Sequence, residues 1–524
     1  MKFLTVDQMR AADKAAIDEV GIPEQVLMNR AGVALARCVK RVARLRGVTR
    51  IILLSGHGNN GGDVCVAARC LHKDGFSVHV IMTCIPSSMK GVAQTAWDEM
   101  QTCGVPFEVI STTESWCKNF ELKSGSLLNY GIVVDGILGT GCKGEPRDVA
   151  AEAIKWINSI RPYCLVVSAD LPSGMNGDTG IAEGDVVKAD LTVTFAAPKQ
   201  GVCNQLAMKN LGQLIVSDIG IPDEIAFKYS AAVKLQLIAR PELKRAYRER
   251  DWAAHKGTYG HVCVIGGSEI YPNAPVLSAM SALKSGAGLT SLWRCCSSEA
   301  ALSLIPEVII RKISLDDFFL TESGLRLKNY ILSEYNAIVI GPGLGCSAGA
   351  KELVKYVLEN FRGRVVLDAD GLNILAGLDR EGYKVREDLT LVITPHPGEA
   401  ARLLNCSTAD IQSERETAVR SLAERYNAIA LLKGAGTLVC CKNKTPWLNL
   451  TGNPGMASAG MGDVLAGITG GLLAQGIDEM LAVTMAVWAH GTAGDLAAIA
   501  GSQTSLTASD LVKMLADVFQ NIER

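Results

Sequence analysis

The residues of this 524-residue chain best suited to chemistry lie near its end, in the segment 453–463, which reads NPGMASAGMGD. Glycines let backbone N–H groups approach an anion closely, and the N-terminus of a helix expected over Val464–Ala474 would add a favourable dipole. Asp463 would repel a bound phosphate, so we interpret it as a base that accepts a proton from an attacking hydroxyl. The segment therefore predicts phosphoryl transfer.

A second glycine-rich segment, Lys433–Thr437, follows an apolar run, and its lysine could neutralise phosphate charge. Four more polar or glycine-rich segments follow apolar runs in this half of the chain, at 266–268, 341–345, 368–373 and 394–399. Ligands bind at the carboxyl ends of strands in open α/β sheets, which favours a site over simple turns and caps. No GxxxxGK[ST] occurs, so a P-loop enzyme is excluded.

Individual side chains in these segments have two interpretations. His396, within Pro395–Glu399, could be a hydrogen-bonded loop histidine, but its motif favours a functional role. Asp368 and Asp370 are equally consistent with loop caps and with a Mg²⁺ or water-mediated role.

The front half has three oxygen-rich segments after apolar runs: Asn59-Asn60, Asp135-Gly136 and 168–174. In a parallel sheet they would converge on one edge. Carboxylate, amide and hydroxyl oxygens without His or Cys suit a hard or alkali cation better than zinc or copper. Such residues also build turns, but three successive examples favour a site.

The segment Gly56–Gly61 contains a formal GxGxxG. A dehydrogenase would then need an acid at the end of the next strand to hold the ribose. The run Val78–Met82 is followed by Thr83-Cys84-Ile85-Pro86, without an acid, which argues against a nicotinamide-dependent oxidoreductase.

These segments need strands and helices to position them. Near-continuous apolar runs alternate with glycine or proline loops and amphipathic helices, which is typical of parallel sheets covered on both faces. The chain is too long for one core. We expect two tandem three-layer α/β/α domains, a Rossmann-like one over 1–223 and a second one over 239–524, with a linker at 224–238. The expected strands are Ile51–Leu54, Val78–Met82, Ile132–Val134, Leu165–Ser168, Leu191–Phe195, Val262–Ile265, Ala337–Ile340, Val365–Leu367, Leu391–Ile393 and Ile429–Leu432.

Composition restricts the partners. The net charge is −2 without a long basic run, which argues against nucleic acid or an anionic membrane surface. The sixteen cysteines include no CxxC, so we expect reduced thiols in a cytoplasmic protein. We find neither a secretory signal nor an apolar run of the ~18–20 residues that a membrane span needs.

The segment 453–467 closely resembles the signature of the NAD(P)H-hydrate dehydratases, a ribokinase-like family. Segments 255–260, 368–373 and 394–399 match in the same order, so the resemblance covers about 240–524. The family phosphorylates the hydroxyl of the 6S hydrates NADHX and NADPHX and then eliminates phosphate. The resemblance implies that the nucleotide contacts Lys433, Gly434, Ala435, Gly436, Thr437 and Gly462. It implies that the hydrate contacts Pro275, Gly343, His396 and Asp463.

The phosphoryl donor follows from the same resemblance. Bacterial two-domain members use ADP and animal relatives use ATP, and the sequence alone does not distinguish them. We expect ADP, giving AMP and phosphate, with Mg²⁺ in the dehydratase domain. Some relatives carry Ala where this chain has Pro275.

Residues 1–222 resemble the NAD(P)H-hydrate epimerase family through 27–32, 58–63, 134–141 and 170–174. That family interconverts the 6R and 6S hydrates and binds K⁺, which would contact Asn60, Asp135 and Ser173. Asp170 would be the acid/base group, with Lys143 assisting. Val64 stands where the family usually has Gly. The resemblance implies that the hydrate contacts Asn59, Asn60, Gly61, Gly62, Asp63, Gly139, Thr140, Gly141, Cys142, Lys143, Gly144, Glu145 and Asp170.

The leading hypothesis is a bifunctional repair enzyme, an epimerase followed by a dehydratase, and by resemblance a homo-oligomer. A ribokinase-type kinase with a ligand-binding front domain, or a nucleotide-binding scaffold, are the alternatives. Epimerisation could proceed by expulsion of hydroxide or by ring opening to an aldehyde, and both routes need a proton donor near C6.

Overall fold

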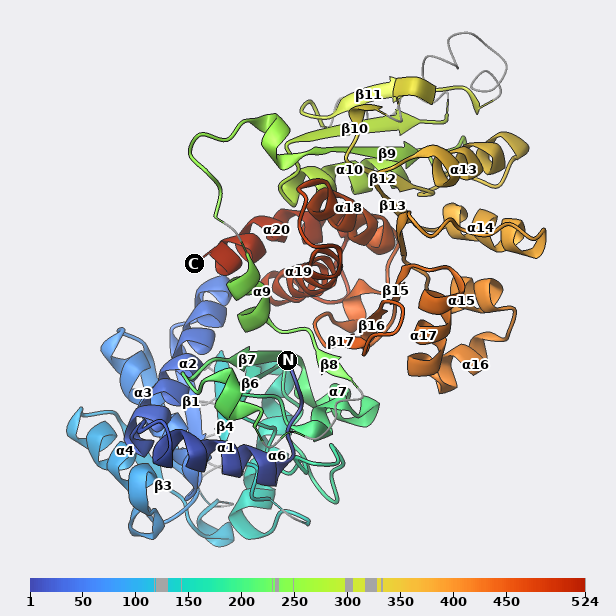
Figure 1. Ribbon diagram of the computed structural model, residues 1–524. Helices are drawn as coiled ribbons and strands as arrows, with labels where there is room; N and C mark the ends of the chain where they lie inside the picture. The colour runs from blue at the N-terminus through green and yellow to red at the C-terminus, as the bar shows by residue number, and fades with distance from the viewer. Residues whose placement is uncertain are drawn as a thin grey trace. The chain divides into compact units, whose positions relative to one another are not determined.

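The computed structural model describes residues 1–116, 118, 131–142, 144–228, 230, 235–247, 249–296, 305–315, 328–330 and 333–523. The chain divides into two compact units, Met1–Val233 and Lys234–Arg524. Each unit is an α/β structure around its own sheet (Figure 1), which confirms the expected fold class.

The described part of the first unit contains a seven-stranded sheet with the order β3-β2-β1-β4-β5-β6-β7, and every neighbouring pair is parallel. The strand order reverses between β1 and β4, so ligands are expected where these two strands end. The strands are β1 (Arg50–Ser55), β2 (Ser77–Met82), β3 (Phe107–Val109), β4 (Ile132–Gly136), β5 (Leu165–Ala169), β6 (Leu191–Phe195) and β7 (Gln213–Ser217).

Helices cover both faces of this sheet. On one face α6 packs on side chains that include Ile52, Leu54 and Val133. On the other face α3 lies against the central strands and is flanked by α2 and α4. The helices are α1 (Val6–Asp18), α2 (Glu24–Arg46), α3 (Asn59–Lys73), α4 (Gly91–Thr102), α6 (Asp148–Ile160), α7 (Gln205–Leu211) and α8 (Asp223–Ala226).

Helix α1 begins at the expected capping box. The Thr5 side chain accepts from the N–H of Gln8, and the Gln8 side chain accepts from the N–H of Thr5. Just before the helix, Leu4 pairs with Lys199 in an isolated parallel bridge. Two backbone hydrogen bonds, Leu4 N to Pro198 O (3.0 Å) and Gln200 N to Leu4 O (2.8 Å), secure the start of α1 beside the end of the sheet.

The second unit has a ten-stranded sheet among its described residues, with the order β11-β10-β9-β12-β13-β14-β15-β16-β17-β8. Its order reverses between β9 and β12. The strands are β8 (Gln236–Leu237), β9 (His261–Gly266), β10 (Leu289–Arg294), β11 (Ile309–Lys312), β12 (Ala337–Ile340), β13 (Arg364–Leu367), β14 (Thr390–Ile393), β15 (Ile429–Leu432), β16 (Thr437–Cys440) and β17 (Trp447–Asn449).

The sheet of the second unit is mixed, unlike the parallel sheet that the apolar runs predict. Strand β16 runs antiparallel to β15 and β17, because the short turn at Gly434–Gly436 leads β15 directly back along its own edge. Strand β8, which falls inside the segment expected to be a linker, pairs with β17.

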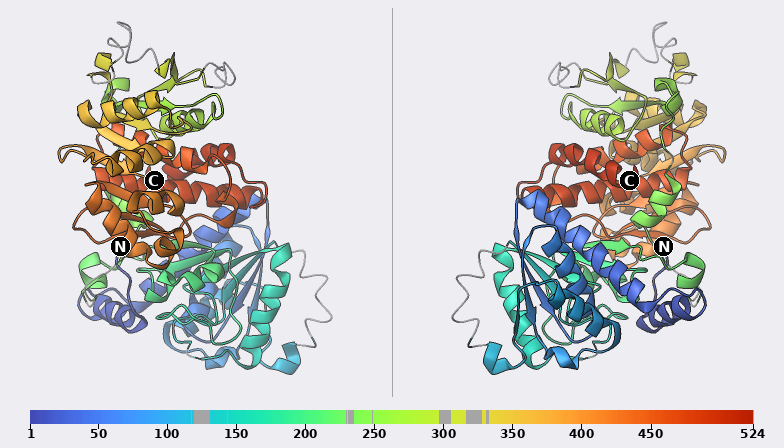
Figure 2. Two further views of the ribbon diagram at one scale, coloured as in Figure 1. Left: turned by 90° about the vertical axis from the view of Figure 1, so that its right-hand side faces the viewer. Right: turned by 90° about the vertical axis from the view of Figure 1, so that its left-hand side faces the viewer.

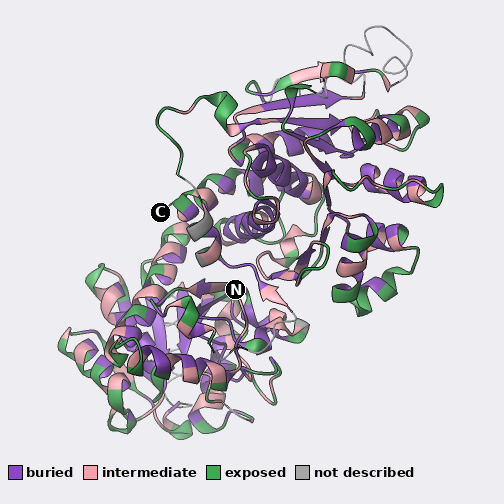
Figure 3. Ribbon diagram, viewed as in Figure 1, coloured by how far each residue is buried: buried purple, intermediate pink, exposed green. Residues whose placement is uncertain are grey.

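Helices α13, α14, α15 and α17 lie on one side of this sheet and α10, α18, α19 and α20 on the other (Figures 1 and 2). Helices α18 and α19 are buried along most of their length (Figure 3). Among the described residues no helix has the length and apolarity to cross a bilayer. The helices are α9 (Arg240–Ala246), α10 (Ala274–Lys284), α13 (Ala348–Asn360), α14 (Asp370–Arg380), α15 (Pro397–Leu404), α16 (Thr408–Ser413), α17 (Arg415–Arg425), α18 (Met461–Ala474), α19 (Glu479–Ala500) and α20 (Ala508–Glu523).

Candidate active sites

A cavity of about 170 Å³ opens where the strands of the first sheet end. Of the predicted residues, Asn59, Asn60, Asp63, Thr140 and Asp170 line it. They come from the start of α3 and from the segments after β4 and β5. The polar segments that follow these strands therefore meet at one edge of the sheet, as expected, around the point where the strand order reverses.

The three residues predicted to hold K⁺ form one hydrogen-bonded group. Asn60 Nδ2 donates to the carbonyl oxygens of Leu138 (3.1 Å) and Ala169 (2.7 Å). Ser173 donates from its N–H (2.9 Å) and its hydroxyl to the Asp135 carboxylate, and its hydroxyl also donates to Leu138 O (3.2 Å). Carboxylate, hydroxyl and carbonyl oxygens thus lie together beside the cavity.

The environment of Asp135 fits a monovalent cation. Its side chain is fully buried, and burial raises the pKa of the carboxyl, although hydrogen bonds from Ser173, Ser168 and Ile137 oppose this. All its donors among the described residues are neutral. A buried carboxylate without a cationic side chain is costly, and a hard cation with oxygen ligands would reduce that cost.

Asp170 is held in an uncommon conformation. Its φ is 61°, and Leu171 N donates to Ala169 O (2.7 Å) across it, which is a tight γ-type turn. Such backbone costs on the order of 1–3 kcal/mol and concentrates at functional sites. The turn directs the Asp170 side chain into the cavity wall.

Lys199 is the partner of Asp170, and the sequence interpretation missed it. The Lys199 side chain is 2% exposed, and its ammonium forms an ion pair with Asp170 Oδ1 and donates to Thr194 Oγ1 (3.1 Å). Thr194 Oγ1 (2.9 Å) and Phe195 N (3.4 Å) also donate to Oδ1. The hydrogen bonds that the described residues make to this carboxylate all end on Oδ1, so Oδ2 carries none of them.

Of the remaining predicted residues of the front site, Gly61 and Gly62 are buried at the start of α3, and the others lie in the segment Gly139–Glu145. Thr140 lines the cavity, and a Cβ placed on Gly141 would lie 3.9 Å from Nη2 of Arg10 on α1. Lys143 lies outside the described residues. Val64, the departure from the family pattern, is fully buried against Gly136 and does not line the cavity.

In the second unit Asp463 lies in the first turn of α18. This helix approaches α10 so closely that a Cβ on Gly467 would lie 2.1 Å from Ser278 O. Ser278 Oγ in turn donates to Asp463 O (2.7 Å), which fixes the backbone of the predicted base. Burial first, and then the nearby Asp368, raise the pKa of Asp463 to about 7, while Lys433 opposes the shift.

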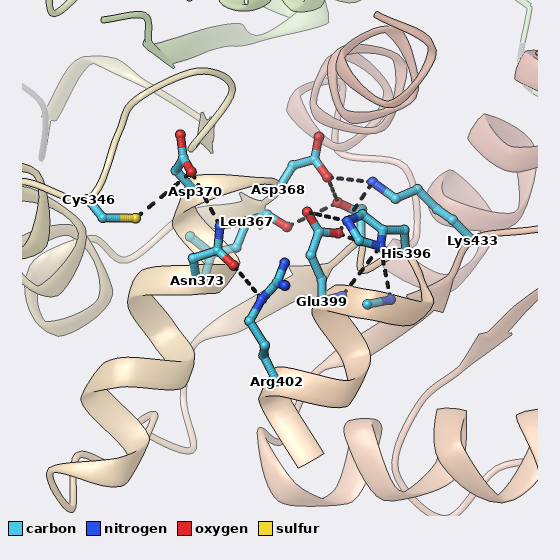
Figure 4. Close-up of polar contacts among 11 residues, drawn as sticks. Cys346, Leu367, Asp368, Asp370, Asn373, His396, Glu399, Arg402 and Lys433 are labelled. Carbon is cyan, nitrogen blue, oxygen red and sulfur yellow. Dashed lines mark hydrogen bonds and ion pairs between the residues drawn. The ribbon is translucent and has the colours of Figure 1, made fainter. Parts of the chain in front are cut away.

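Lys433 joins the two segments predicted to bind nucleotide. Its Nζ donates to Asp368 Oδ1 (2.9 Å) and lies 3.8 Å from Glu399 Oε2 (Figure 4). Burial opposes the charged ammonium, but the attraction of Asp368 and Glu399 outweighs it and raises the pKa of Lys433. A Cβ on Gly462 would lie 3.3 Å from Nζ, so a side chain at this position would crowd the ammonium beside α18.

His396 is the N-cap of α15. Its Nδ1 accepts from the N–H groups of Gly398 (3.0 Å) and Glu399 (3.4 Å), and the Glu399 carboxylate accepts from His396 N (2.8 Å). Burial and the charge of Lys433 lower the pKa of the imidazole. His396 is therefore neutral at pH 7, with half of its side chain exposed beside the Asp368–Lys433 pair.

Asp368 and Asp370 diverge (Figure 4). Asp368 accepts from Lys433 and from Thr394 Oγ1 (2.7 Å), whereas Asp370 accepts from Gly345 N (2.8 Å). They do not share a ligand position. No cluster of three His, Cys, Asp or Glu suited to a metal occurs among the described residues. Mg²⁺ commonly binds through one or two carboxylates plus substrate phosphates, so Asp368 fits an ion that arrives with the nucleotide.

Gly343 and Pro275 lie where the order of the second sheet reverses. Gly343 follows β12 with φ 60°, and a Cβ there would lie 2.7 Å from Tyr271 O in the segment after β9. Pro275 is buried in the first turn of α10, and a Cβ on Gly266 would lie 3.2 Å from it. The structure thus places both at the same sheet edge as Asp368 and Lys433.

Two buried residues that support the second site escaped the sequence interpretation. Arg415 Nη2 donates to the carbonyl oxygens of Leu432, Lys433 and Gly436 (3.2–3.3 Å) and so shapes the turn that carries Lys433. Asp495 accepts from Gly452 N (2.9 Å) and Asn453 Nδ2 (3.0 Å). Asp495 could have been found in the sequence, because it is a single aspartate inside the apolar run that forms α19.

Comparisons with known proteins find a matching family for each half of the chain. A family model described as NAD(P)H-hydrate dehydratase matches residues 262–517, and one described as YjeF-related protein N-terminus matches residues 24–201. The bifunctional NAD(P)H-hydrate repair enzyme Nnr of Moorella thermoacetica is 36% identical and covers 100% of this chain and 97% of the relative. The Escherichia coli enzyme of the same name is 34% identical, over 97% of this chain and 92% of its own length.

Among solved structures, an ADP/ATP-dependent NAD(P)H-hydrate dehydratase from Bacillus subtilis, co-crystallised with ATP and Mg²⁺, is 28% identical. The match covers 56% of this chain and 100% of that chain, with a TM-score of 0.48.

Proposed function

The chain belongs to the family of bifunctional NAD(P)H-hydrate repair enzymes, and on this premise we propose that its two units carry out two successive repair steps. The first unit interconverts the 6R and 6S hydrates of NADH and NADPH. The second unit dehydrates the 6S hydrate to NAD(P)H, with ADP as the phosphoryl donor that leaves as AMP and phosphate.

The observation that carries this proposal is the arrangement around Asp463. A carboxyl with a pKa of about 7 lies at the start of a buried helix, beside the ammonium of Lys433. A base is most effective when its pKa is near the working pH, and the cation suits the charge of a transferring phosphoryl group. This combination is what attack of a hydroxyl on a phosphate requires.

The reaction then follows from leaving-group chemistry. Asp463 takes the proton of the hydrate's hydroxyl. The hydroxyl oxygen attacks the terminal phosphorus of ADP, and AMP leaves. Phosphate then leaves with its bonding electron pair, and the loss of a proton from the neighbouring ring carbon restores the double bond. Mg²⁺ held near Asp368 would screen the phosphate charge.

In the first unit Asp170 serves as an acid/base group at C6, and Lys199 holds one of its oxygens. Asn60, Asp135 and Ser173 fit K⁺, which would order the segment that carries Leu138 and Thr140 next to the hydrate. We include homo-oligomerisation, expected from the family resemblance, in the proposal.

The decisive experiment follows a mixture of 6R and 6S NADPHX with the full-length chain and either ADP or ATP. We expect complete recovery of the near-ultraviolet absorbance of reduced nicotinamide, release of inorganic phosphate, and a preference for ADP. Replacement of K⁺ by tetramethylammonium should slow only the 6R portion.

Two outcomes would contradict the proposal. If NADPH is recovered from only half of the mixture, after correction for spontaneous epimerisation, the first unit is not an epimerase. A stable phosphorylated product without restored absorbance would indicate a small-molecule kinase instead.

A further inference from the structure

Helix α1 forms part of the wall of the front cavity, although none of its residues belongs to the predicted site. Met9, Arg10 and Asp13 of α1 line the same cavity as Asp63 and Asp170. The helix is secured there by the Leu4–Lys199 bridge and by the hydrogen bond from Val6 N to Asp178 Oδ1 (2.7 Å). The backbone at the start of α1 is therefore held beside the cavity.

The cavity concentrates carboxyl groups. Asp13, Asp63 and Asp170 come from three different parts of the unit and interact with one another and with the buried cation Lys199. Lys199 forms its ion pair with Asp170. Neighbouring carboxylates in a desolvated site disfavour one another's charged form, so such a cluster can hold a neutral carboxyl beside a carboxylate.

No contact that Asp13 makes with the described residues explains its position. None of the hydrogen bonds found among the described residues ends on its carboxyl group, and the side chain is half-buried. A half-buried carboxyl without a hydrogen-bond donor pays a desolvation penalty. Its presence is therefore better explained by a ligand in the cavity.

Inversion at C6 needs two proton transfers. In the route through hydroxide expulsion, the C6–O bond breaks as the ring nitrogen donates its lone pair, and the departing oxygen takes a proton to leave as water. Water then adds to the opposite face of C6 and gives up a proton as the ring nitrogen recovers its pair. One carboxylic acid and one carboxylate on different walls would perform both transfers without net consumption of protons.

We propose that Asp13 is the second proton-transfer group of the front site and exchanges protons with the hydrate on the face opposite Asp170. This inference rests on the proposed epimerase function. Asp170, paired with Lys199, is the carboxylate of the pair, and Asp13 is the acid in one direction and the base in the other.

Asp13 suits this task better than Asp63. Burial, and then the charge of Asp170, raise the pKa of Asp63 well above its usual range, which disfavours its charged form. Burial also raises the pKa of Asp13, but Lys199 opposes this, and the result is about 6. A group that titrates near neutrality can both give and take a proton.

The test uses the full-length chain with Asp13→Asn, which is nearly isosteric. We expect conversion of purified 6R NADPHX to the 6S form, corrected for the spontaneous rate, to fall by at least ~10²-fold. The ADP-dependent rate on purified 6S hydrate should not change, which also shows that the chain is folded. Asp18→Asn is the matched control, because Asp18 is an exposed aspartate on the same helix.

A loss of less than about tenfold in Asp13→Asn, below the usual range for a lost acid–base group, would overturn the inference. Asp13→Glu keeps an acid at this position and should retain more activity than Asp13→Asn, and an equal loss in both would also overturn it. If the unmodified chain does not convert the 6R hydrate faster than buffer, the proposed epimerase function itself fails and the role of Asp13 fails with it.

Discussion

At the scale of single residues, Asp463 links the environment of a side chain to a rate. Its pKa of about 7 has burial as its main cause. The carboxylate is the base, and the ionised fraction rises with pH. We therefore expect turnover of the 6S hydrate to increase as pH rises through about 7 and to level off above it, which a pH profile of kcat with saturating ADP measures.

Asp463→Asn removes this base while keeping its shape. Turnover should fall by at least ~10²-fold, whereas ADP binding, followed by calorimetry, should persist because Lys433 and its turn are unchanged. Asp517→Asn, at an exposed position on α20, is the control. Unchanged turnover in Asp463→Asn would remove the base role.

Individual residues also show how far sequence reasoning reaches. Asp135, Asp170 and Asp463 were predictable because each follows an apolar run or opens a helix, and the chain must place such residues at one edge of a sheet. Lys199 and Asp13 were not predictable, because they meet Asp170 only through the three-dimensional approach of α1 to the end of β6. Their roles, like those of all the predicted site residues, stay proposals.

At the scale of elements, α18 is placed by small residues. A Cβ on Gly467 would lie 2.1 Å from the backbone oxygen of Ser278, the residue whose hydroxyl holds Asp463. We expect Gly467→Ala to destabilise the second unit by about 1–3 kcal/mol through overpacking and to reduce 6S turnover by displacing Asp463. Urea unfolding monitored by fluorescence measures the first effect.

Gly377 provides the matched control for that substitution. It lies inside α14, and a Cβ there would meet nothing within 4 Å. Gly377→Ala should therefore stabilise the unit by roughly 0.5–1 kcal/mol, the usual helical preference for alanine. If both substitutions have the same sign, close packing is not what positions α18.

Elements differ in how visible they are in the sequence. The central strands of both sheets are buried apolar runs and were expected within one or two residues of their observed ends. Strands β16 and β17 are short, and their antiparallel direction depends on the turn at Gly434–Gly436 rather than on their own composition. Periodicity contains no information about strand direction, so the mixed edge could not be predicted.

At the scale of the whole molecule, each unit contains its own candidate groups among the described residues. The described residues that line the front cavity belong to the first unit, and the contacts that Asp463, Lys433 and Asp368 make with described residues lie within the second. We therefore expect that neither an Asp170→Asn chain nor an Asp463→Asn chain alone clears a mixture of 6R and 6S hydrates. The two chains combined, with ADP present, should clear the mixture completely.

The measurement is the final amount of NADPH recovered, compared with the sum of the separate reactions. Full recovery would mean that the hydrate passes between sites through solution. Recovery limited to the 6S portion would mean that transfer requires both active sites in the same chain.

The bridge between Leu4 and Lys199 has a consequence for biosynthesis. The bridge joins Leu4, at the start of the first unit, to Lys199, which lies near the end of that unit. Domains that emerge first from the ribosome generally fold first, but here α1 reaches the ribosome exit long before its partner segment. The wall of the front cavity can therefore form only after Lys199 has been translated and released from the exit tunnel. Until then α1 lacks its native partner, although it was among the first segments to be synthesised.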